Sequence, residues 1–156
     1  MDDDIVRGLH VMFLQVLLVD AVIHLTVVVP RLQAVLSSGV FPPRIVTTLM
    51  TLSILAIVLG VAAAALGVLP RRPLYLLAAA LMVAQILAWL TFHNTGVAGG
   101  HTHDTGLLTS VLQHLDADPI EGAAKAVEGI ALVLSLLLYR VEGQTRRATS
   151  ADPTEA

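Results

Sequence analysis

The side chains that can bind a metal ion or carry a proton are concentrated in residues 93–128. This stretch contains four of the six histidines and five carboxylates, and its only Lys or Arg is Lys125. The histidines and carboxylates are His93, His101, His103, His114, Asp104, Asp116, Asp118, Glu121 and Glu128. Imidazole and carboxylate groups bind copper and zinc, and they also pass protons. Because the flanking segments are apolar, the sequence predicts a polar site within a membrane protein.

A second pair of such side chains lies in the first apolar segment. Asp20 and His24 are four residues apart, so they project side by side from a helix. The pair can chelate a divalent metal, or it can relay a proton with the carboxylate orienting the imidazole. The third interpretation is a hydrogen-bonded pair that holds this helix to its neighbours. A carboxylate in hydrocarbon is costly unless it faces protein or water, so both side chains should point into a bundle.

The Asp20-x-x-x-His24 pair on an apolar helix is similar to part of the copper-binding motif in the C subunit of particulate methane monooxygenase. That family carries a further histidine about thirteen residues later, a position that Ser37 occupies here. The likeness covers these five residues, and no family is assigned on it.

The loop after the third apolar segment is another candidate metal site. In an extended chain, residues two apart point the same way, so His101 and His103 can bind one divalent ion. His93, His114 or a carboxylate would have to complete such a site, and the alternative is a solvated polar loop. His24 and His93, on different spans at similar depth, also permit ligation of haem b.

The composition places the chain in a bilayer. Its 156 residues are 56% hydrophobic and 13% charged, with a mean hydropathy of +0.81, which leaves too little polar surface to cover a water-soluble globule. A net charge of -3 and the lack of a basic patch argue against nucleic acid as a partner. Without cysteine, a metal must rest on His, carboxylate or Met.

The hydropathy pattern predicts an all-α fold, an integral membrane four-helix bundle that forms a single domain over residues 1–143. The predicted spans are about 8–29, 45–69, 74–94 and 119–141. A short amphipathic interfacial helix is expected at about 105–115, between the third and fourth spans. Residues 144–156 are expected to be a disordered tail.

Local signals define the ends of the helices. Asp118, Pro119 and Glu121 are typical of the N-cap, first and third positions of a helix, and Gly143 is a plausible C-cap. Pro30 should end or kink the first helix. Small residues that recur on one face of the second span are typical of close helix packing in lipid. They are Ser53, Ala56, Gly60, Ala63, Ala64 and Gly67.

The distribution of cations sets the expected orientation. With four spans, both termini share a side with the loop between the second and third spans, and that side carries more Lys and Arg than the other. Its cations are Arg7, Arg71, Arg72, Arg140, Arg146 and Arg147, whereas the opposite side has Arg31, Arg44 and Lys125. By the positive-inside rule, both termini are cytoplasmic and the histidine-rich loop lies outside the cell membrane.

This topology brings the polar residues to the outer half of the bundle. The expected metal ligands are Asp20, His24, His93, Glu128, His101 and His103. The expected supporting network is Thr47, Thr51, Gln85, Glu121 and Lys125. The sequence therefore predicts a small multi-pass membrane protein with an outward-facing site for copper or zinc, used for redox chemistry, handling or transport.

Two other functions fit the same residues. The chain can be a non-enzymatic subunit whose polar cluster stabilises the bundle or docks a partner, within a homo-oligomer or a larger membrane complex. It can also be a subunit of a proton-coupled transporter, or hold haem b. No catalytic motif occurs, so the sequence names no catalytic residue and leaves open whether the protein is an enzyme.

Overall fold

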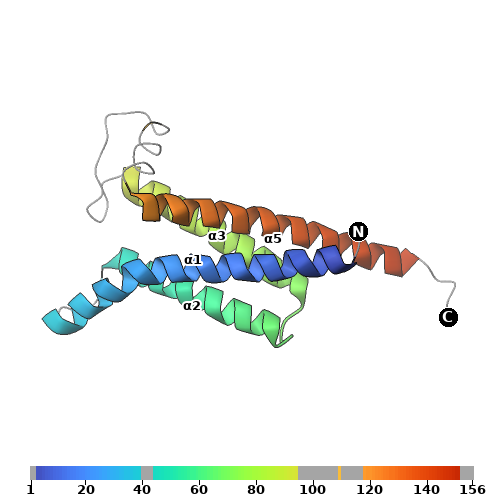
Figure 1. The fold of residues 1–156 in the computed structure, drawn as a ribbon, viewed down its shortest axis with the longest axis horizontal. Coiled ribbons are helices and arrows are strands. Elements are labelled where there is room, and N and C mark those ends of the chain that lie inside the picture. The colour runs from blue at the N-terminus through green and yellow to red at the C-terminus, as the bar shows by residue number, and fades with distance from the viewer. Residues whose placement is uncertain (1–2, 40–43, 95–108, 110–117, 152–156) are drawn as a thin grey trace.

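A computed structural model describes residues 3–39, 44–94, 109 and 118–151. These residues contain four long α-helices and no strand, which confirms the all-helical prediction (Figure 1). The helices are α1 (Asp3–Ser38), α2 (Ile45–Ala65), α3 (Arg71–Asn94) and α5 (Pro119–Ala151). The predicted interfacial helix at 105–115 lies outside the described residues.

All four helices are long and apolar enough to cross a membrane. Their outer surfaces carry large exposed apolar side chains, for example Val22, Leu59, Leu77 and Val133. A surface of this kind suits contact with lipid and would be unfavourable in water. The fold is therefore that of a multi-pass membrane protein.

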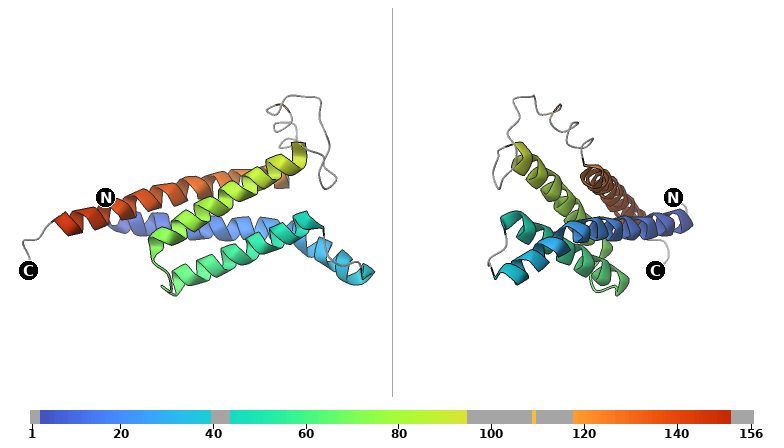
Figure 2. Two further views of the ribbon diagram at one scale, coloured as in Figure 1. Left: turned by 180° about the vertical axis from the view of Figure 1, so that it is seen from behind. Right: turned by 60° about the vertical axis from the view of Figure 1, so that its left-hand side comes forward.

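The four helices run roughly along one axis. The beginning of α1, the turn between α2 and α3 and the end of α5 lie at one end of the bundle (Figures 1 and 2). The end of α3 and the beginning of α5 lie at the opposite end. Helix α1 packs against both α2 and α5, and α5 packs most extensively against α3.

Helix α1 continues through Pro30 as far as Ser38, so of the two predicted effects of Pro30 the structure shows a kink and not an end, and the helix extends past the predicted span limit of residue 29. Proline lacks the N–H that would bond to the carbonyl of Thr26, and it therefore bends a helix without always ending it. Figure 1 shows the last part of α1 turning away from the axis of the rest.

Helix α2 ends at Ala65, four residues before the predicted limit of 69. Gly67 adopts a φ of 64°, in the left-handed region that favours glycine. The N–H of Gly67 then bonds to the carbonyl of Ala64, and that of Val68 to Ala63. These two bonds form a Schellman motif, which closes the helix.

Helices α3 and α5 are longer than predicted. Helix α3 begins at Arg71, because Pro73 is tolerated in a first turn whose N–H groups need no partner. Helix α5 passes through Gly143 to Ala151, so Gly143 is not a C-cap and the tail expected to be disordered from residue 144 is helical over this part. Its start is as predicted, since Asp118 Oδ1 accepts the N–H groups of Ile120 and Glu121.

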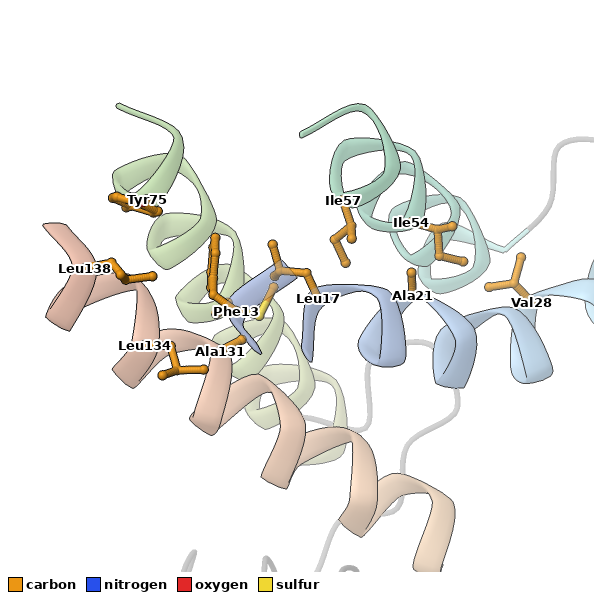
Figure 3. Close-up of a cluster of buried hydrophobic side chains, with 11 residues drawn as sticks. Phe13, Leu17, Ala21, Val28, Ile54, Ile57, Tyr75, Ala131, Leu134 and Leu138 are labelled. Carbon is orange, nitrogen blue, oxygen red and sulfur yellow. The ribbon is translucent and has the colours of Figure 1, made fainter. Parts of the chain in front are cut away.

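The core has two connected parts (Figure 3). In one, Phe13 from α1 packs among side chains of α3 and α5, with its ring edge-on to Tyr75 at 5.6 Å between centroids. In the other, Leu17, Ala21 and Val28 of α1 face Ile54 and Ile57 of α2. Helix α1 is therefore the element that joins the two parts.

The predicted helical faces agree with the observed burial. In α1, Phe13, Leu17, Asp20 and His24 are all buried, whereas Gln15 on the other side is exposed. The prediction of close helix packing along the small-residue face of α2 does not hold at Gly60. A Cβ atom added at Gly60 would meet nothing within 4 Å, so no neighbouring helix of the described residues approaches closely at that position.

We expect Leu138→Ala to destabilise the bundle much more than Leu137→Ala. Leu138 is 1% exposed and Leu137 is 42% exposed. Because lipid solvates both residues in the unfolded state, the cost of Leu138→Ala is mainly that of the cavity, about 1–3 kcal/mol. Unfolding of the detergent-solubilised protein by added denaturing detergent measures both variants, and equal losses would contradict this packing.

Candidate metal centre

The interface between α1 and α5 contains a buried group of ionisable side chains. Asp20 and His24 lie one turn apart on α1, and Glu128 faces them from α5. Asp20 and Glu128 are fully buried and His24 is 7% exposed. One ligand atom from each residue lies within 4.8 Å of the other two, which is close enough to surround a metal ion.

Both ring nitrogens of His24 lie near oxygen atoms. Nδ1 lies 3.0 Å from the carbonyl oxygen of Asp20 and 3.3 Å from Asp20 Oδ1. Both oxygens are acceptors, so a neutral imidazole donates from Nδ1 and keeps a lone pair on Nε2. Nε2 lies 3.7 Å from Glu128 Oε1. The two ring nitrogens of His24 therefore face carboxylates from two different helices.

Lys125 pairs with Glu128 one turn away on α5. Its Nζ lies 2.5 Å from Oε1 and 2.7 Å from Oε2 of Glu128. The ammonium group also lies 5.7 Å from the centre of the Trp89 ring. By contrast, Asp20 has no ammonium or guanidinium partner among the described residues: Oδ1 lies 3.3 Å from His24 Nδ1, and Oδ2 is buried without a hydrogen-bond partner. Asp20 is the polar group in this site with unused capacity to accept.

Helix α3 contributes polar groups at the same level. Trp89 Nε1 donates a hydrogen bond to Glu121 Oε1 at the start of α5. Gln85 lies one turn before Trp89, at the level of Lys125 in the antiparallel partner. Gln85 is 9% exposed, and neither atom of its amide has a partner among the described residues. A buried amide of this kind requires hydrogen-bond partners, and water is one group that can supply them.

The two predicted supporting threonines, Thr47 and Thr51, both lie on α2. Thr47 is buried, and the Thr51 hydroxyl donates to the Thr47 carbonyl at 2.8 Å. This hydrogen bond stays within α2. No hydrogen bond of the described residues connects either threonine to Asp20 or His24, so their predicted supporting role stays a prediction.

The histidines predicted to complete the site are not placed. His93 belongs to the last turn of α3, and its side chain lies outside the described part of the structure. His101 and His103 also lie outside the described residues. The structure therefore brings together three of the six predicted ligands and does not test the other three.

Sequence reasoning missed the contacts that connect different helices. Glu121 on α5 accepts a hydrogen bond from Trp89 on α3. His10 Nδ1 on α1 lies 3.0 Å from the Tyr75 hydroxyl on α3. Depth in the membrane could have predicted both contacts, because the two residues of each pair lie at similar depths in the predicted spans.

These observations define an integral membrane helical bundle with a buried histidine and carboxylate site between two of its helices. Comparison with known protein families, curated proteins and solved structures finds no significant match to this chain. Its function is accordingly argued from the chemistry of the site.

We expect Lys125→Met to destabilise the metal-free protein strongly. The substitution removes the cation beside the fully buried Glu128, and an uncompensated buried charge costs about 3–5 kcal/mol. The double variant Lys125→Met, Glu128→Gln removes both charges and should recover most of the loss. The measurement is the free energy of unfolding of both variants in detergent.

Arg7→Met is the matched control for this prediction. Arg7 and Asp4 are an exposed pair 4.0 Å apart, so the loss of this cation should change stability by less than about 0.5 kcal/mol. If Lys125→Met is as stable as the double variant, the contact between Lys125 and Glu128 does not compensate a buried charge.

Proposed function

We propose that this membrane protein binds one divalent transition metal ion, copper or zinc, between α1 and α5. Asp20, His24 and Glu128 would be the ligands. The observation that carries the proposal is the convergence of these three side chains within 4.8 Å in a buried site. An imidazole with two carboxylates is a donor set that suits both metals.

The charge of the site supports a divalent ion. Asp20, Glu121 and Glu128 supply three negative charges and Lys125 supplies one positive charge, so the cluster has a net charge of −2 with a neutral imidazole. A divalent cation would neutralise this cluster completely. Because charge is costly in a bilayer, the neutral complex is favoured over the empty site.

The spacing of the ligand atoms also supports the proposal. Zinc bonds of about 2.0–2.1 Å place neighbouring ligand atoms roughly 3.3 Å apart. Nε2 of His24 and Oε1 of Glu128 are already 3.7 Å apart. Binding would require Lys125 to leave Glu128, and it can then pair with Glu121, one turn earlier on the same helix. Asp20 would supply the third ligand from its carboxylate, of which Oδ2 has no hydrogen-bond partner among the described residues.

Access to the site would come from the end of the bundle where α3 ends and α5 begins. We propose that His101 and His103 capture the ion there and that His93 lies on its path. On the positive-inside rule this end faces outward from the cell membrane, with both termini cytoplasmic. The role would be metal handling, transport or redox chemistry at the outer face.

Haem b is a less favourable cofactor for this geometry. Ligation of its iron by His24 and His93 would need Nε2 of His24 to face an apolar macrocycle. In the structure this nitrogen faces the buried carboxylate of Glu128. A metal ion uses that carboxylate as a ligand, whereas haem would leave its charge next to the ring.

The second candidate function is a non-enzymatic subunit in which the polar cluster stabilises the bundle or docks a partner. The observation that favours it is the contact of Lys125 with both oxygens of Glu128. In this case the ammonium group is the permanent counter-charge and no ion replaces it. Metal binding distinguishes the two functions.

The test is metal titration of the purified protein after chelator treatment. We expect one zinc or copper ion per chain, measured by elemental analysis after desalting, and no Soret band. The double variant Asp20→Ala, His24→Ala should lose this ion. Glu128→Gln, which keeps the size of the side chain, should weaken binding by more than about 100-fold, since loss of a group that merely orients a ligand costs about 10–100-fold.

Two further variants serve as controls. His10→Ala removes the histidine at the other end of α1 and should leave the stoichiometry unchanged. The double variant His101→Ala, His103→Ala should slow uptake but keep one ion per chain. If the Asp20→Ala, His24→Ala variant binds metal with unchanged stoichiometry, the metal site lies elsewhere; if the wild-type protein binds none, the structural role is favoured.

A further inference from the structure

The end of the bundle opposite the metal centre holds a second polar site, between α3 and α5. The guanidinium of Arg72 lies over the ring of Tyr139, 4.5 Å from its centroid. An open cavity of about 250 Å³ lies beside them. Its walls are Arg72, Tyr139, Arg140, Gly143 and Gln144. Since a water molecule occupies about 30 Å³ in the liquid, the cavity is large enough for a phosphate group.

Arg72 has unused capacity to donate hydrogen bonds. Its Nε atom is buried and has no partner among the described residues. A guanidinium group presents its N–H donors at the edge of a plane, in a fork that matches the oxygens of a phosphate. Tyr139 lies under this plane, which holds the guanidinium in position beside the cavity.

Gly143 is the residue that allows this arrangement. A Cβ atom at position 143 would lie 3.2 Å from Nη2 and 3.5 Å from Cζ of Arg72. A side chain there would push the guanidinium from its place against α5. Since Gly143 lies inside a continuous helix, its conformation does not require glycine, and the close approach of Arg72 gives a reason for it.

The cavity lies at the ends of two candidate membrane spans, where lipid headgroups are expected. Arg72 is in the first turn of the α3 span, and the α5 span ends at Gln144. Arg140 adds a second cation, and Glu142 in the same turn of α5 does not line the cavity. Basic pockets between membrane helices bind acidic headgroups, and tyrosine is common at this depth.

We propose that this cavity binds the phosphate group of an anionic phospholipid, with Arg72 and Arg140 as the cationic partners. The proposal does not depend on metal binding, because the two sites lie at opposite ends of the helices. It assigns a role to the arginine-rich end of the bundle beyond setting orientation.

The test is native mass spectrometry of the full chain in detergent, with added phosphatidylglycerol or phosphatidylcholine. We expect the wild-type protein to retain phosphatidylglycerol in preference. Arg72→Gln should weaken this binding about fivefold, and Arg72→Gln with Arg140→Gln more than about 20-fold, while phosphatidylcholine binding stays unchanged. Gly143→Leu, which keeps both cations but fills the cavity, should also reduce binding.

Arg7→Gln is the control, because it removes an exposed cation at the same end of the bundle. Equal binding of the two lipids, or an equal loss in Arg7→Gln and Arg72→Gln, would overturn the proposal. Inorganic phosphate is the third probe, and binding of phosphate alone with the same dependence on Arg72 would show a site for the free anion. If Arg72→Gln does not fold, the binding of phosphatidylglycerol by Arg140→Gln tests the proposal instead. The Arg140 side chain is exposed and not part of the packing, so this variant should fold.

Discussion

The structure depends on the compensation of two carboxylates that are completely removed from solvent. Asp20 and Glu128 face each other across the contact between α1 and α5, in a protein whose outer surface is suited to hydrocarbon. Neither charge is tolerable there without a partner. Lys125 compensates Glu128, and His24 lies between the two carboxylates. These contacts require the faces of α1 and α5 that carry the ionisable groups to point at each other, and the apolar side chains on the same faces, among them Phe13, Leu17 and Ala131, form the core.

The two ends of the bundle have different chemistry. At one end, the buried acidic groups of the described residues exceed the cations, and Asp20 Oδ2 and the amide of Gln85 have no hydrogen-bond partner there. At the other end, arginines lie near the surface, and aromatic rings from α1, α3 and α5 separate them from the acidic site. Tyr75 is central to this separation, since its ring packs against Phe13 and its hydroxyl bonds to His10. The acidic end attracts cations, and the arginine end attracts anions.

Much of this could be predicted from the sequence because it depends on local rules. The helical period placed Asp20 and His24 on the buried face of α1, and the cap at Asp118 fixed the start of α5. The predictions that failed concern distant contacts or backbone detail. Pro30 could end or bend a helix, and the local pattern does not decide between the two. Gly143 looked like a helix end, whereas it lies within α5 and has Arg72 of α3 packed close against it. The partner of Glu121 on α3 required the register between two helices, which local spacing does not provide.

The central claim is that one imidazole and carboxylates from two helices surround the same ion. X-ray absorption spectroscopy of the zinc-loaded protein tests it directly, because scattering from imidazole rings reports the number of histidine ligands. The account predicts a single imidazole with oxygen ligands making up the remainder, and loss of that imidazole signal in His24→Ala. Two or more imidazoles around the ion, or an unchanged signal in His24→Ala, would contradict it.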